Sequence, residues 1–242
     1  MAEKTPKPPT PVAKSHALRG AHDEAPHARR GVARPAPHEK PWLDELDGLR
    51  TNAEGRLGTE DKRRDALVGG AEGLHREGKL EWYKEYDGYG EAGCVSLPFI
   101  AAAKAGLISM AQAVRLSQHP KAADGDIQSV ILDIFGYVGW SKTPDSRKWG
   151  HPTCKPKKGD VALFVSKKND SDFTHAALIA SQAGDLYSLE PSSDGSPAKL
   201  RKSHITTYIA ESKAAMTSDP EQPMTAQEAD DALGCIICPF PF

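Results

Sequence analysis

The stretch THAALIASQAGDLYSLE, residues 174–190, indicates the fold more clearly than any other part of the chain. Two mainly apolar runs, 174–181 and 185–190, flank a turn that contains Gly184. This pattern is typical of a β-hairpin. We therefore predict two antiparallel strands, with His175 and Glu190 as neighbours at the open end of the hairpin.

Helices are predicted before this hairpin, and further strands on either side of it. Apolar residues at helical spacing predict helices in four regions, namely within 42–80, at about 98–105, at 109–117 and at 126–138. Additional strands are expected at about 160–166 and 205–210. Helices followed by a small antiparallel sheet indicate the α+β class.

Composition divides the chain into three parts. Residues 1–41 hold eight prolines and almost no large aliphatic side chains, so we expect a disordered arm. Residues 42–212 carry the predicted helices and strands and are expected to form the folded domain. Residues 213–242 are expected to be an acidic tail whose last residues dock on that domain.

Charge and hydropathy narrow the possible partners. The net charge of −2 favours neither nucleic acid nor an anionic membrane as a partner. No apolar run approaches the roughly 18 residues of a membrane span, and no signal-peptide pattern begins the chain. We expect synthesis in the cytoplasm, where four cysteines in 242 residues are ordinary usage.

Cys94 is the candidate nucleophile. It follows Gly93 and precedes a predicted helix, and a helix N-terminus lowers a thiol pKa and favours an oxyanion. Such a thiol needs a base and a group that orients the base, and His175 and Glu190 follow in that order. The alternatives are a buried apolar cysteine, a hydrogen-bonded histidine at a strand edge and a solvated carboxylate.

These residues resemble the CHAP and NlpC types of papain-like cysteine amidases and peptidases. On this resemblance Cys94 matches the nucleophile, His175 the general base and Glu190 the acidic third residue, while Gly159-Asp160 matches the turn before the first strand. Ser192 stands where CHAP domains commonly have asparagine. The resemblance implies that 42–212 is a papain-like catalytic domain.

The resemblance also implies a substrate and a setting. The substrate would be a peptide amide in the stem peptides of bacterial peptidoglycan. A wall substrate without a signal peptide implies an effector toxin that is exported to the periplasm of a target cell. Its partners would be a cognate immunity protein and a secretion-machine component bound by the N-terminal arm. The alternatives are a deamidase or transglutaminase-like toxin, and a non-catalytic papain-like binding module.

An aromatic, glycine-rich loop lies immediately before Cys94. Tyr86 and Tyr89 in this loop, together with Ser192, are the candidate substrate-binding residues. The alternative is that the loop covers and fills the core.

We expect no cofactor and no metal. Cys235 and Cys238 have the C-x-x-C spacing of redox and zinc sites, but no pattern of alternating strand and helix surrounds them. A zinc site would need two more ligands, for which His151 and Cys154 are the candidates. We interpret the C-terminal pair as part of the docking segment.

Overall fold

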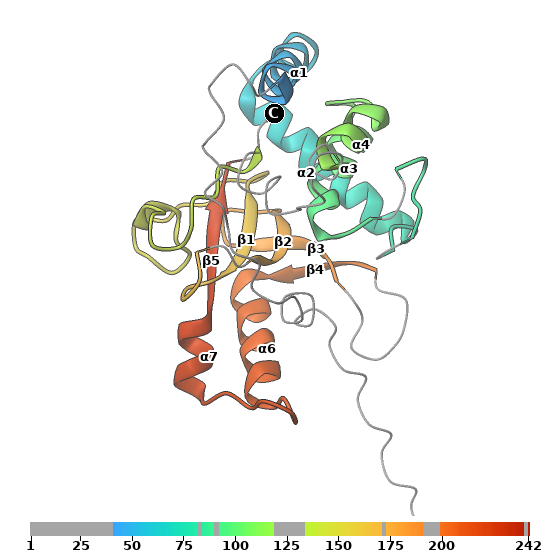
Figure 1. Cartoon of the computed structure of the whole chain (residues 1–242). Helices are drawn as coiled ribbons and strands as arrows, with labels where there is room; N and C mark the ends of the chain where they lie inside the picture. Colours follow the sequence, from blue (N-terminus) through green and yellow to red (C-terminus); the bar gives the residue numbers. More distant parts are fainter. Residues whose placement is uncertain are drawn as a thin grey trace, which may run out of the picture.

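The computed structural model describes residues 41–81, 84–89, 92–118, 134–170, 173–190, 199–239 and 242, and side chains from residue 47 onward. The described part has the α+β fold, with helices on both faces of one antiparallel sheet (Figure 1). The expected disordered arm lies outside these residues, apart from Pro41, where the first helix begins. None of the described helices has the length and apolar character needed to cross a bilayer.

The sheet has five strands in the order β4-β3-β2-β1-β5. Their bounds are β1 Val161–Ser166, β2 Phe173–Ile179, β3 Asp185–Leu189, β4 Leu200–His204 and β5 Leu233–Cys238. The predicted hairpin is confirmed, because β2 and β3 pair antiparallel with Ala177 opposite Ser188. Continuing this register by two residues places His175 opposite Glu190.

The helices form two layers. Their bounds are α1 Pro41–Leu57, α2 Glu60–Glu77, α3 Leu97–Lys104, α4 Met110–Gln118, α6 Ile205–Thr217 and α7 Ala226–Ala232, with short 3-10 helices η3 Cys94–Ser96 and η5 Asp145–Arg147. The first four lie on one side of the sheet, and α6 and α7 on the other (Figure 1). The helices predicted at 98–105 and 109–117 are confirmed as α3 and α4.

Each side of the sheet has its own apolar core. Leu67 and Leu74 of α2 pack with Phe99 of α3 on one side. Helices α2 and α3 approach closely at Gly70, where an added Cβ would lie 2.2 Å from the carbonyl oxygen of Ala101. The other core lies between the sheet and the helices α6 and α7. The sheet is therefore buried on both faces.

The strand predicted at 205–210 is wrong. Residues 205–210 begin α6, and the fourth strand is the preceding segment, β4. The Nδ1 atom of His204 accepts a hydrogen bond of 3.1 Å from the backbone N–H of Thr206, which caps the N-terminus of α6. This cap starts the helix although the β-branched residues at its start favour a strand.

The helix predicted at 126–138 is only partly described. Residues 126–133 lie outside the described part, and the helical state ends at Ile134. Gly136 has a φ of +61°, and Val138, expected on the buried face, is 46 % exposed. The prediction is therefore wrong for residues 136–138, because the chain turns at Gly136.

The C-terminal part belongs to the fold more fully than the sequence indicated. The expected boundary at residue 212 falls within α6, and the predicted docking segment contains β5. This strand pairs with β1 along its whole length, from Val161 opposite Cys238 to Ser166 opposite Leu233. Pairing with β1 makes residues 233–238 an edge strand of the sheet.

A partly buried ion pair fixes the Gly159-Asp160 turn against α2. Arg64 donates hydrogen bonds to the Asp160 carboxylate at 2.6 Å and to the carbonyl oxygen of Lys158 at 3.0 Å. The second carboxylate oxygen of Asp160 accepts a bond of 2.8 Å from the backbone N–H of Lys157. The start of β1 is therefore held in place by α2.

Replacing Asp160 by alanine is expected to lower the free energy of unfolding by about 2 kcal/mol, because it removes a partly buried ion pair, although Arg64 keeps Glu60 and the carbonyl of Lys158 as partners. Asp65→Ala is the matched control, since it removes an ion pair with Lys158 between two exposed side chains. That change should cost less than about 1 kcal/mol. Urea unfolding of both variants measures the difference, and equal losses would contradict the prediction.

Candidate active site

Cys94 lies at the start of a helical segment, as predicted. It is the first residue of η3, which leads directly into α3. Burial raises the pKa of its thiol to about 11, although the backbone N–H groups of Ala176, Val95 and Cys94 itself act in the opposite direction. The lowered thiol pKa expected from the helix start is therefore wrong for the free protein, because burial outweighs the N–H groups.

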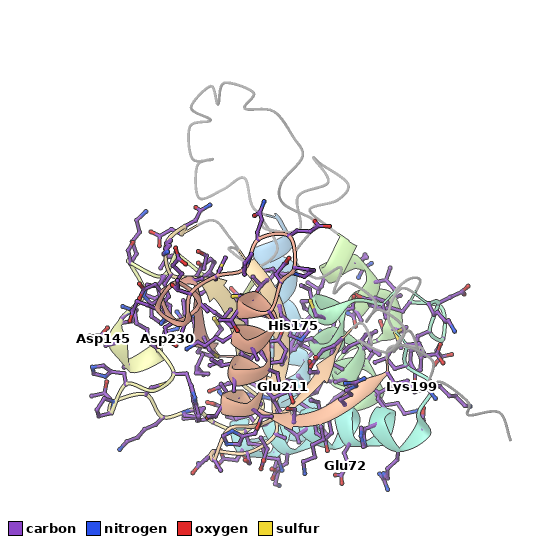
Figure 2. The ribbon with its side chains drawn as sticks, turned by 90° about the horizontal axis from the view of Figure 1, so that it is seen from below. Glu72, Asp145, His175, Lys199, Glu211 and Asp230 are labelled. Carbon is purple, nitrogen blue, oxygen red and sulfur yellow. The ribbon has the colours of Figure 1, made fainter. Side chains whose placement is uncertain are left out.

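His175 lies on β2, with its ring toward α6. The ring stacks on Tyr208 of α6 at a centroid distance of 5.1 Å and an interplanar angle of 14°, and Phe164 of β1 lies 6.0 Å away. In Figure 2, His175 and Glu211 of α6 are labelled beside this helix. Burial lowers the pKa of His175 to about 3, so its imidazole is neutral near pH 7.

Ser188 connects His175 to Glu190. The Nε2 atom of His175 lies 2.6 Å from the Ser188 hydroxyl oxygen, and that hydroxyl donates a hydrogen bond of 2.5 Å to the Glu190 carboxylate. Glu190 thus contacts Ser188, whereas direct orientation of the imidazole was expected. Burial raises the pKa of Glu190, and Glu211 adds to this, while Ser188 and Arg201 lower it.

Cys94 and His175 belong to different layers of the fold. Cys94 belongs to the core on the α2 and α3 side, whereas the His175 ring packs on the α6 side. The Cys94 thiol reaches the backbone of β2, where it interacts with the N–H group of Ala176, the residue after His175. Glu190 raises the pKa of Cys94, and Cys94 contributes to the raised pKa of Tyr208. The thiol is thus within electrostatic range of both groups.

The Cys94 thiol interacts with the backbone of β2 next to His175, and it is not bonded to the His175 imidazole. No hydrogen bond joins these two described side chains. Because Nε2 of His175 is engaged with Ser188, Nδ1 is the ring nitrogen left for Cys94. Hydrogen bonds between catalytic groups are often long in a free enzyme and shorten when substrate binds. Proton transfer between Cys94 and His175 therefore requires a movement that brings the thiol to Nδ1.

The predicted substrate-binding residues are only partly described. Tyr86 and Tyr89 are buried in the core on the α2 side, at 7 % and 2 % exposure, and the Tyr86 hydroxyl donates to Glu77 at 3.1 Å. Burial, followed by this bond to Glu77, raises the pKa of Tyr86 to about 12. These positions fit the alternative of a loop that fills the core. Ser192 lies outside the described residues.

The C-terminal cysteines are free thiols on opposite faces of β5. Cys235 packs in the α6-side core and Cys238 in the α2-side core, where its sulfur accepts a hydrogen bond of 2.8 Å from Arg147. This divergence prevents the pair from chelating one ion. Within the described residues, no three or more histidine, cysteine or acidic side chains are grouped so that they could hold a metal.

Two residues of this site were not predicted from sequence. Ser188 could have been found, because it is two residues before Glu190 on a predicted strand and so shares its face. Tyr208 could not, because its contact with His175 depends on α6 being a helix.

Comparison with known proteins identifies no relative. The chain matches no protein-family model, no curated protein sequence and no solved structure. The resemblance to papain-like cysteine amidases therefore rests on the residues quoted above.

Proposed function

We propose that this protein is a papain-like cysteine hydrolase that cleaves amide bonds. The observation that carries the proposal is the position of Cys94, at the start of a helical segment and beside the strand that carries His175. The Ser188 hydroxyl supports it, because it engages Nε2 of His175 while donating to Glu190, which leaves Nδ1 as the nitrogen that can act on the thiol.

The proposed reaction uses these groups in turn. Nδ1 of His175 takes the proton of the Cys94 thiol as the sulfur attacks the amide carbonyl carbon. In the proposed reaction the backbone N–H of Cys94 stabilises the oxyanion. The imidazolium then protonates the leaving amine, and the C–N bond breaks to give a thioester. Water, deprotonated by the same imidazole, hydrolyses the thioester and restores the thiol.

Burial of Cys94 and His175 affects how the thiol becomes a nucleophile. The raised pKa of Cys94 and the lowered pKa of His175 favour the neutral pair in the free protein. We expect substrate binding to bring the polar groups that stabilise the thiolate and imidazolium. The thiol should accordingly be slow to react with alkylating agents when no substrate is bound.

The proposed substrate is an amide of the peptidoglycan stem peptide, in an effector that acts in the periplasm of a target cell. A non-catalytic binding module is the second candidate, because Cys94 and His175 are both buried and share no hydrogen bond. An immunity protein that covers the Cys94 site remains the expected partner of an active toxin.

Digestion of purified peptidoglycan separates the two functions. The full chain is expected to release soluble fragments, and mass spectrometry should locate new amine and carboxyl ends at one amide. Cys94→Ala should release none. Sedimentation of the chain with intact sacculi and no new ends would favour the binding module. If the chain neither binds nor cleaves peptidoglycan, the proposal of a wall substrate is wrong.

A further inference from the structure

A chain of two hydrogen bonds runs from Glu190 through Ser188 to His175. Both bonds are short, at 2.5 and 2.6 Å, and the Ser188 side chain that they share is fully buried. Ser188 lies near the C-terminal end of β3, opposite Ala177 of β2. The backbone pairing of two sheet strands therefore fixes its position.

Counting the available protons fixes which group donates and which accepts in these two hydrogen bonds. An ionised carboxylate only accepts hydrogen bonds, and a serine hydroxyl has a single proton to donate. When Ser188 gives that proton to Glu190, its oxygen can only accept from His175. Nε2 must then carry the ring proton, and Nδ1 has a free lone pair.

From this geometry we infer that Ser188 is a positioning residue that holds His175 in its Nε2–H tautomer, with Glu190 fixing the direction of the Ser188 hydroxyl. The tautomer assignment depends only on the hydrogen bonds. Its role in making Nδ1 a base rests on the function proposed above.

The surroundings of the ring make Ser188 hard to replace. Tyr208 stacks on His175 and Phe164 lies near it, so apolar groups occupy the space around the ring. Without the serine hydroxyl, a protonated Nε2 becomes a buried donor without a partner, which is unfavourable. The ring is then free to move its proton to Nδ1, where it can no longer accept the thiol proton.

The direction of these two hydrogen bonds depends on the charge of Glu190. The groups that act on this carboxyl are Ser188 on β3, Arg201 on β4, Glu211 on α6, and the Cys94 and Tyr208 side chains. A protonated Glu190 can donate to Ser188, which can then donate to Nε2 and shift the ring proton to Nδ1. Because burial raises the pKa of Glu190, this reversal should begin at a higher pH than for an exposed glutamate.

Nuclear magnetic resonance of the full chain, labelled with ¹⁵N in its histidine rings, tests the inference without a substrate. The His175 signals are assigned as those lost in His175→Gln. At pH 7 the wild-type ring should show the Nε2–H tautomer, and acidification should move it toward Nδ1–H. A wild-type ring in the Nδ1–H form at pH 7 would overturn the inference.

Substitutions provide the second arm of this experiment. Ser188→Ala should convert the His175 signals to a mixture of tautomers and lower turnover about 10- to 100-fold, whereas Ser188→Thr, which keeps the hydroxyl, should restore the wild-type tautomer. Ser181→Ala is the matched control, because it removes a 2.7 Å serine–carboxylate bond to Asp185 at the other end of the hairpin. It should leave the His175 signals unchanged.

The two proposals fail in different ways. An unchanged tautomer in a folded Ser188→Ala protein would refute the role of Ser188, even if amide cleavage is observed. A wild-type Nε2–H tautomer without cleavage of any amide would instead refute the proposed function and leave the role of Ser188 intact.

Discussion

Replacing Cys94 by alanine is expected to abolish amide cleavage, with turnover at least about 10⁴-fold lower, because no other group can form the thioester. The fold should remain. The side chain is small and 7 % exposed, and alanine fits the same space at the start of η3. Turnover is measured from new amine ends, and stability from urea unfolding.

Cys154→Ala is the matched control for this prediction. Cys154 is also a free thiol with a raised pKa, but it packs at the edge of the α6-side core and takes no part in the site. Its replacement should leave turnover unchanged. A Cys94→Ala protein with near wild-type turnover would show that the nucleophile assignment is wrong.

The parts of the fold that the sequence predicted are those with a strong local pattern. The β2 and β3 hairpin has apolar runs on each side of a turn at Gly184, whose φ of +99° glycine adopts readily. In contrast β4 contains the exposed residues Arg201 and Lys202 and lies at an edge of the sheet, so it has no apolar run. Its formation depends on pairing with β3, and such pairing is not visible in local sequence.

β5 illustrates a second limit. The run Leu233–Cys238 is apolar enough for a strand, but its partner β1 is about 70 residues earlier in the chain. Sequence spacing alone does not identify a partner at that distance. The short polar C-terminal part was therefore interpreted as a tail, although its last strand completes the sheet.

The candidate site was also only partly predictable from the sequence. Cys94 and His175 were found because each has a characteristic local context, a helix start and a strand start. The pKa of the thiol was predicted with the wrong sign, because burial depends on how η3 packs against β2. Tyr208 was missed since the residues around it are β-branched and favour a strand. Only the His204 cap and the packing of α6 bring its ring onto His175.

Replacing His175 by glutamine should lower turnover as much as Cys94→Ala, because the base is lost and water cannot reach this buried position easily. Glutamine keeps much of the volume and can still bond to Ser188, so the fold should survive. Glu190→Gln should be less damaging, since Ser188 still contacts the ring. Equal losses in His175→Gln and Glu190→Gln would contradict the assignment of the base.

The pH dependence of the free energy of unfolding tests the state of His175 independently of turnover. The pKa of His175 is about 3 in the folded protein and near 6.5 when the chain is unfolded, so between these values the unfolded state binds more protons. Stability should therefore fall as pH decreases through this window, by up to about 1.4 kcal/mol per pH unit from this one group. His175→Gln should remove that part of the slope, whereas the same change at the exposed His151 should leave turnover unchanged. A wild-type slope that persists in His175→Gln would show that the imidazole is not buried in its neutral form, and the proton transfer from Cys94 would then need another acceptor.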